Sequence, residues 1–213
     1  MKRLSRSLAV CAFVLLRLSS GLAQSLLQYD QQSSDYLLPP GYGDGSIYQT
    51  IQQPFGQSFT PTLTTVGFIQ LKLADANPDG NRGATVFVDL YSEALDGNLL
   101  ASSKALTFPD GFRGIATFQF SDPVETTPGD IYYFAPRVSR LTTLPDGNFG
   151  NSDSWEIIVG PYPYNRGSVI VGGNAKPYIN LWFREGVVVP EARTSVLLFL
   201  GVILLLSHRS AHH

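Results

Sequence analysis

The sequence predicts an all-β fold, an antiparallel sandwich of two sheets with jelly-roll-like connections. Apolar residues alternate with polar ones in many short runs, and turn-forming residues separate these runs. No long apolar stretch at helical spacing occurs outside the two ends of the chain. Many short strands in a chain of this size favour a sandwich. A short helix is expected at each end, an N-terminal signal helix and a C-terminal transmembrane helix.

The alternation is clearest in three runs, at 69–73, 85–91 and 116–120. In each run every second residue is apolar, the pattern of a strand with one buried face. Val88 and Phe118 lie near the centres of their runs and are expected in the core. Asp-Gly pairs, which tolerate positive φ, mark several of the turns. Further strands are expected at 48–52, 99–106, 131–135, 155–159, 168–171 and 179–184.

The N-terminal residues have the pattern of a cleaved secretory signal. A basic segment precedes an apolar run at 8–16, and Gly21 and Ala23 then supply the small residues typical of a cleavage site. Cleavage is expected after Ala23, because the run is shorter than the roughly 20 residues that span a bilayer. The expected partners are therefore the export machinery and signal peptidase. The alternative is a membrane helix that remains uncleaved.

The remaining domain, 24–189, lacks the residues of several common chemistries. The only cysteine, Cys11, lies in the signal, and the three histidines lie at 208–213. Disulfides and thiolate chemistry are therefore excluded from the domain, as are imidazole bases and imidazole metal ligands. Its 16 acidic and nine basic residues give a net charge of −7, which argues against a nucleic-acid partner. No catalytic residue is predicted.

The C-terminal segment begins with Val189, Pro190, Glu191 and Ala192, continues into an apolar run at 196–206 and ends in basic residues. This order resembles the PEP-CTERM sorting tail of exported bacterial proteins, with Ala192 in place of that family's second proline. The resemblance implies processing by a membrane exosortase. It also implies a location at the outer face of the cytoplasmic membrane, and then at the cell surface or in the extracellular matrix. The alternative is a plain single-pass anchor.

Several strand sequences are similar to β-sandwich modules found in many PEP-CTERM proteins, in which the position of Asn180 is often Asp. The similar segments are 57–60, 63–73, 128–133, 164–167 and 180–184. This similarity implies a sandwich fold and a cell-surface setting, and it assigns no chemistry. The expected organisation is a signal at 1–23, an irregular lead-in with room for one edge strand at 24–45, the sandwich at 46–186, and the sorting tail at 187–213.

The segment 75–81 has the alternate oxygen spacing of a calcium loop, with Asp75, Asn77 and Asp79 as its ligands. Position 12 of such a loop is normally a glutamate and is Val86 here. A polar hairpin turn is therefore the favoured interpretation, and a calcium site is the alternative. No other cofactor is expected.

Aromatic residues provide the candidate binding site. Tyr162 and Tyr164 lie in a Pro-rich turn, where they are expected to be exposed, and Trp155 begins a predicted strand. Flat aromatic faces suit sugar rings, so these three residues are the candidate carbohydrate-binding residues. Core packing is the alternative, because large aromatic side chains also dominate sandwich cores. Trp182 is expected to be structural.

Two hypotheses of different classes follow. The first is a non-catalytic surface or matrix protein whose sandwich binds exopolysaccharide. The second is an enzyme that acts on extracellular polysaccharide through two carboxylates, which would stand roughly 5–10 Å apart. A groove with two such carboxyl groups would favour the enzyme, and coplanar exposed aromatic rings would favour the binder. The glutamates available to an enzyme are Glu93, Glu125, Glu156 and Glu185, besides twelve aspartates.

Overall fold

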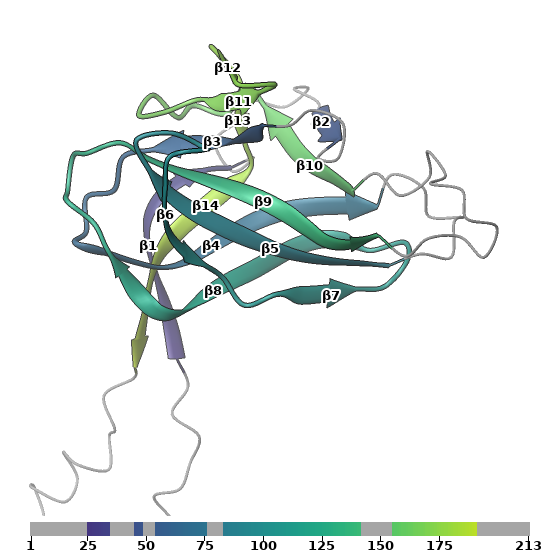
Figure 1. Cartoon of the computed structure of the whole chain (residues 1–213), viewed down its shortest axis with the longest axis horizontal. Helices are drawn as coiled ribbons and strands as arrows, with labels where there is room; N and C mark the ends of the chain where they lie inside the picture. The colour runs from purple at the N-terminus through teal and green to yellow at the C-terminus, as the bar shows by residue number, and fades with distance from the viewer. Residues whose placement is uncertain (1–24, 35–44, 49–53, 76–82, 142–154, 191–213) are drawn as a thin grey trace, which may run out of the picture. The chain divides into compact units, whose positions relative to one another are not determined.

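The computed structural model describes residues 25–34, 45–48, 54–75, 83–141 and 155–190. Within these residues the chain forms strands joined by turns and loops, with no helix (Figure 1). The predicted all-β class is therefore confirmed. The chain divides into two units, Leu27–Val188 and the two ends, and nearly all described residues belong to the first. The predicted signal lies outside the described residues.

One antiparallel sheet, sheet A, is built around the long strand β4 (Thr65–Asp75). β8 (Arg113–Glu125) pairs along one edge of β4. β14 (Phe183–Pro190) and β10 (Trp155–Gly160) pair with successive parts of the other edge. The remaining strands of sheet A lie beside β14 or β10; they are β1 (Ser25–Ser33), β2 (Gly45–Tyr48) and β13 (Asn180–Leu181).

The second antiparallel sheet, sheet B, has β5 (Ala84–Ser92) and β9 (Tyr132–Leu141) at its centre. β3 (Phe55–Phe59) pairs with β9 on the edge away from β5. The outer strands pair with β5, with β3 or with each other; they are β6 (Asn98–Ser102), β7 (Leu106–Phe108), β11 (Val169–Val171) and β12 (Asn174–Lys176).

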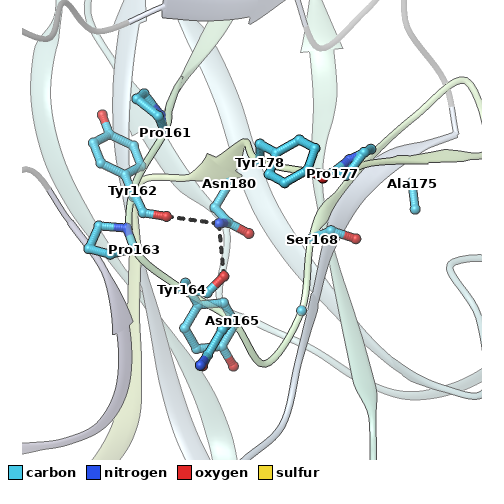
Figure 2. Close-up of a pocket in the computed structure, with 11 residues that line it drawn as sticks. Pro161, Tyr162, Pro163, Tyr164, Asn165, Ser168, Ala175, Pro177, Tyr178 and Asn180 are labelled. Carbon is cyan, nitrogen blue, oxygen red and sulfur yellow. Dashed lines mark hydrogen bonds between the residues drawn. The ribbon is translucent and has the colours of Figure 1, made fainter.

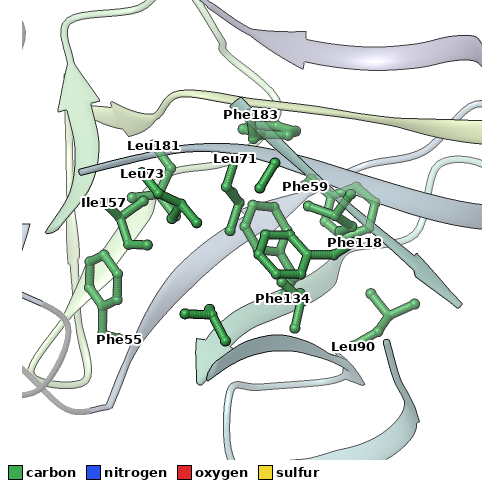
Figure 3. Close-up of a cluster of buried hydrophobic side chains, with 14 of the residues drawn as sticks. Phe55, Phe59, Leu71, Leu73, Leu90, Phe118, Phe134, Ile157, Leu181 and Phe183 are labelled. Carbon is green, nitrogen blue, oxygen red and sulfur yellow. The ribbon is translucent and has the colours of Figure 1, made fainter. Parts of the chain in front are cut away.

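Side chains from both sheets meet in one hydrophobic core (Figure 3). Phe183 of sheet A lies edge-on to two rings of sheet B, with centroids 5.3 Å from Phe134 and 6.5 Å from Phe59. The predicted core positions Val88 and Phe118 are both fully buried. Alternation thus placed one face of each central strand in the core, where burial of a large apolar side chain contributes about 1.5–3 kcal/mol.

The predicted strand at 99–106 is two strands, β6 and β7, because Ser103 interrupts the ladder. The N–H of Ser103 donates to the carbonyl of Val88, and the N–H of Val88 donates to Oγ of Ser103 at 2.9 Å. A side-chain oxygen therefore takes the place of a main-chain acceptor at this point. The second half of the run then pairs with β5 as a separate strand, with Thr85 opposite Thr107.

Several strands lie where alternation gave no signal, and β3 and β1 are two of them. β3 is buried along its whole length although its centre is Gly56, Gln57 and Ser58. β1 falls in the expected irregular lead-in, and its sequence is mostly polar. Both strands depend on hydrogen bonds to distant segments, which a local pattern does not reveal.

Candidate functional site

The structure buries all three predicted carbohydrate-binding aromatics. Tyr162 is 2% exposed and Tyr164 is 9% exposed, so the expectation that they are exposed is wrong. Trp155 is also buried, with its ring centroid 5.6 Å from Phe108 and 6.2 Å from Phe112. Trp155 therefore belongs to the core cluster at one end of β10.

The two tyrosines are buried for different reasons. Tyr164 packs edge-on against Phe183 with centroids 5.1 Å apart, and its hydroxyl oxygen accepts the N–H of Thr60 at 3.0 Å. Burial raises the pKa of this hydroxyl above its usual value. Tyr162 lies over Gly160, where an added Cβ would stand 2.9 Å from the tyrosine ring. It joins a small cluster with Ala74, Ile158 and Trp182, and Trp182 is structural as expected.

Asn180 holds both tyrosines in place (Figure 2). Its Nδ2 donates to the carbonyl of Tyr162 at 3.0 Å and to the carbonyl of Tyr164 at 3.1 Å. Its Oδ1 accepts from Nε2 of Gln57 at 3.0 Å. Oε1 of Gln57 in turn accepts the N–H of Leu181. Two buried amides, one on each sheet, therefore fix the turn that carries the tyrosines.

This turn forms one side of a pocket of about 760 Å³. Figure 2 shows the turn from Pro161 to Asn165 on one side and Pro177 and Tyr178 on the other. The lining contains tyrosine, proline and small polar residues and no charged side chain; its members are Pro161, Tyr162, Pro163, Tyr164, Asn165, Gly167, Ser168, Ala175, Pro177, Tyr178 and Asn180. The volume is in the range of sites that bind small molecules.

The exposed aromatic residue of the pocket is Tyr178, which the sequence did not single out. Its side chain is 90% exposed, and its φ of 73° lies in the left-handed region. Tyrosine rarely adopts this conformation, which favours glycine. A turn signal was available in the sequence, since Pro177 precedes Tyr178. That signal indicates a turn and gives no indication of the exposure of the ring.

The predicted calcium ligands are described only in part. Asp75 is 5% exposed, and its Oδ2 accepts the N–H of Gly111 at 2.9 Å. This carboxylate therefore helps to hold the turn between β7 and β8. Asn77 and Asp79 lie outside the described residues. Among the residues that are described, no three acidic side chains gather in a group that could hold a metal ion.

Two carboxyl groups meet where β1 lies beside β14. Asp30 accepts hydrogen bonds from Thr62 and from the N–H of Leu63. Partial burial raises the pKa of Asp30, but these hydrogen bonds outweigh that effect and hold the pKa below its usual value. Glu185 is fully buried, and it lies against the side chain of Asp30 and the backbone of Gln31. Burial and the charge of Asp30 raise the pKa of Glu185 to about 9.

A third carboxylate lies in a network on sheet B. Asp89 is 3.4 Å from Nε of Arg137 and accepts hydrogen bonds from Ser102 and from the hydroxyl of Tyr91. Nη2 of Arg137 donates to the same hydroxyl at 3.2 Å. The network connects β5, β6 and β9, so it ties neighbouring strands of sheet B together.

The structure describes the first half of the predicted sorting motif. Val189 and Pro190 are the last residues of β14, and Glu191 and Ala192 lie outside the described residues. β14 therefore continues past 186, the expected end of the sandwich. In the part of the chain that the structure describes, no helix is long and apolar enough to cross a membrane.

No protein-family model matches the sequence, and no curated protein is significantly similar to it.

Proposed function

We propose that the chain is an exported, non-catalytic surface or matrix protein whose jelly-roll-like sandwich binds extracellular polysaccharide at the pocket beside Tyr178. Its proposed partners are the export machinery, signal peptidase and an exosortase that acts on the C-terminal tail. The observation that carries the binding role is Tyr178, a large aromatic side chain that is 90% exposed at the rim of a pocket.

Tyr178 contributes little to the stability of the fold. An exposed ring gains almost none of the free energy that burial of an aromatic side chain provides. A non-glycine residue in the left-handed region costs of order 1–3 kcal/mol. Backbone strain of this kind is common at binding sites. A tyrosine at this position is therefore better explained by an interaction with a ligand than by packing.

The lining also suits a sugar chain. The ring of Tyr178 presents a flat apolar surface, onto which the C–H face of a sugar can pack, and Pro177 and Pro163 add apolar surface to the same lining. Asn165 and Ser168 supply uncharged polar groups that can exchange hydrogen bonds with hydroxyls. Because buried hydrogen bonds fix the turn at Tyr162 and Tyr164, one side of the pocket is formed before any ligand binds, which lowers the cost of ordering.

The partners of the carboxylates support a non-catalytic role. Asp75 holds the N–H of Gly111, and Asp89 is paired with Arg137. The carboxyl pair of Asp30 and Glu185 has separated pKa values, as an acid–base pair would, but Glu185 is 0% exposed and a substrate cannot reach its oxygens. These four carboxyl groups therefore stabilise strands and turns of the fold.

Affinity electrophoresis tests the binding role. The full-length chain is run through gels that contain dextran, xylan or polygalacturonate, alongside Tyr178→Gly and Tyr178→Phe. At least one polymer should retard the wild-type chain and Tyr178→Phe but not Tyr178→Gly. Tyr178→Gly should unfold no more easily than the wild type, because glycine accepts a φ of 73°.

The matched control is Ile115→Ala, which removes a 50% exposed apolar side chain on β8, outside the pocket lining. This variant should be retarded like the wild type. Retardation of Tyr178→Gly equal to that of the wild type would reject the pocket as the binding site.

A further inference from the structure

The segment that builds the pocket differs in charge from the rest of the domain. Between 157 and 184 the sequence contains three basic residues and no acidic residue, whereas the domain as a whole has a net charge of −7. β3, whose Gln57 donates a hydrogen bond to the lining residue Asn180, also has no acidic residue. The pocket therefore occupies a locally basic part of an acidic domain.

Two of these basic residues adjoin the pocket lining. Arg166 lies between the lining residues Asn165 and Gly167, and Lys176 lies between Ala175 and Pro177. Both are exposed, and neither makes an ion pair with another described residue. The charge of Arg166 is close enough to favour the ionised form of the Tyr164 hydroxyl. Its backbone is fixed by the hydroxyl of Thr60, which donates to the Arg166 carbonyl at 3.0 Å.

Two carboxyl groups, Asp30 and Glu185, act on the hydroxyl of the lining residue Tyr164. Asp30 has a lowered pKa and is negatively charged at neutral pH, whereas Glu185 is buried with a raised pKa and is uncharged there. The residues next in sequence to the lining therefore carry two positive charges, on Arg166 and Lys176, against the one negative charge of Asp30.

We infer that the pocket binds an anionic polysaccharide, one whose sugars carry carboxylates, as uronates do. This inference rests on the proposed polysaccharide-binding function. An acidic domain repels an anionic polymer, so a locally basic site is needed to bring one into contact. A guanidinium also matches a carboxylate geometrically, because it can donate two parallel hydrogen bonds. The aromatic and proline rings then take the sugar faces, while Arg166 and Lys176 take the carboxylates.

The test compares two forms of one polymer. Binding of the full-length chain is measured to polygalacturonate and to the same polymer with its carboxyl groups methyl-esterified. The wild-type chain should bind the acid form more tightly. This preference should fade as salt rises from about 0.01 M to about 1 M, over which the Debye length falls from about 30 Å to about 3 Å.

The decisive variant is Arg166→Gln with Lys176→Gln, and its control is Lys104→Gln with Arg113→Gln. The control removes the same charge from two exposed residues outside the lining. Loss of both pocket charges should weaken binding to the acid form by about ten-fold, about three-fold for each charge, and leave binding to the ester unchanged. The control should bind like the wild type.

The outcomes separate the two proposals. Equal affinity for acid and ester, or equal loss in the pocket and control variants, would overturn the anionic ligand and leave polysaccharide binding standing. Binding to neither of these polymers, with dextran or xylan bound through Tyr178, would again overturn only the anionic ligand. No binding to any of the four polymers would overturn both.

Discussion

Nε2 of Gln57 on β3 donates a hydrogen bond to Oδ1 of Asn180 on β13, at 3.0 Å and with both residues buried. The pair joins sheet B to sheet A across 123 residues of sequence. All the polar atoms of the two amides find partners, because Oε1 of Gln57 accepts the N–H of Leu181 and Nδ2 of Asn180 donates to two carbonyls. The cross-link therefore orients the pocket at no cost in unsatisfied polar groups.

Replacing Asn180 by aspartate should destabilise the fold. A carboxylate cannot donate to the carbonyls of Tyr162 and Tyr164, so the free energy of unfolding should fall by about 3 kcal/mol at pH 7. Below about pH 4 the new carboxyl is protonated and regains one donor, so the loss should be smaller there. Urea unfolding at both pH values measures this. Asn98→Asp, the same change at an exposed position, should have little effect; equal losses in the two variants would contradict the proposed cross-link.

Glu185 should make the protein less stable as the pH rises. Its pKa is about 9 in the folded state and 4.5 in the unfolded chain, so the folded state holds one more proton between these values. The free energy of unfolding should therefore fall with pH across this window, by up to about 1.4 kcal/mol per unit. Glu185→Gln should remove that slope in urea unfolding between about pH 5 and about pH 9. The control is Glu125→Gln, at an exposed position, and a wild-type slope in Glu185→Gln would contradict the assignment.

Phe118 should be one of the residues on which the fold depends most. It is fully buried, and its ring centroid lies 6.3 Å from that of Phe108 in the other sheet. Phe118→Ala should lower the free energy of unfolding by about 3–5 kcal/mol. Chemical denaturation measures the change, with Ile115→Ala on the same strand as the exposed comparison. A loss below about 1 kcal/mol would contradict the assignment of Phe118 to the core.

Calcium should leave the melting temperature unchanged. Asp75 already accepts the N–H of Gly111, so one of the three predicted ligands serves the turn between β7 and β8. Extracellular calcium sites have dissociation constants of about 10⁻⁴–10⁻³ M, so calcium above about 1 mM would raise the melting temperature if a site were present. Scanning calorimetry with and without calcium tests this. A rise that Asp79→Ala abolishes would establish the site.

The C-terminal tail should retain the protein until it is processed. The apolar run at 196–206 would span only about 16 Å as a helix, against a hydrocarbon core of about 30 Å. Deleting 191–213 leaves β14 complete, because that strand ends at Pro190, and should release the folded domain into the medium. In cells with an exosortase, the full chain should become shorter at its C-terminus. Intact-mass measurement decides this; surface material that still ends at His213 would identify a plain anchor.

The sequence by itself determined the fold class and the core faces of the central strands. At β4, β5 and β8 the alternation of apolar and polar residues is a local property, and it is the same property that buries one face of a strand. Val88 and Phe118 could therefore be placed in the core from their neighbours alone. The absence of histidine and cysteine from the domain is likewise readable directly from the sequence.

Only the tertiary structure decided which aromatic rings are buried and which is exposed. Tyr162 and Tyr164 lie in a Pro-rich turn, and a turn of this composition is expected to be exposed. Hydrogen bonds from Asn180 and Thr60 to this turn, and from Gln57 to Asn180, instead hold it against the sandwich. Tyr178 is exposed, in a turn where its φ is 73°. The positions that decide these contacts are up to 123 residues apart. A local pattern reports the neighbours of a residue along the chain, whereas burial and hydrogen bonding depend on neighbours in space.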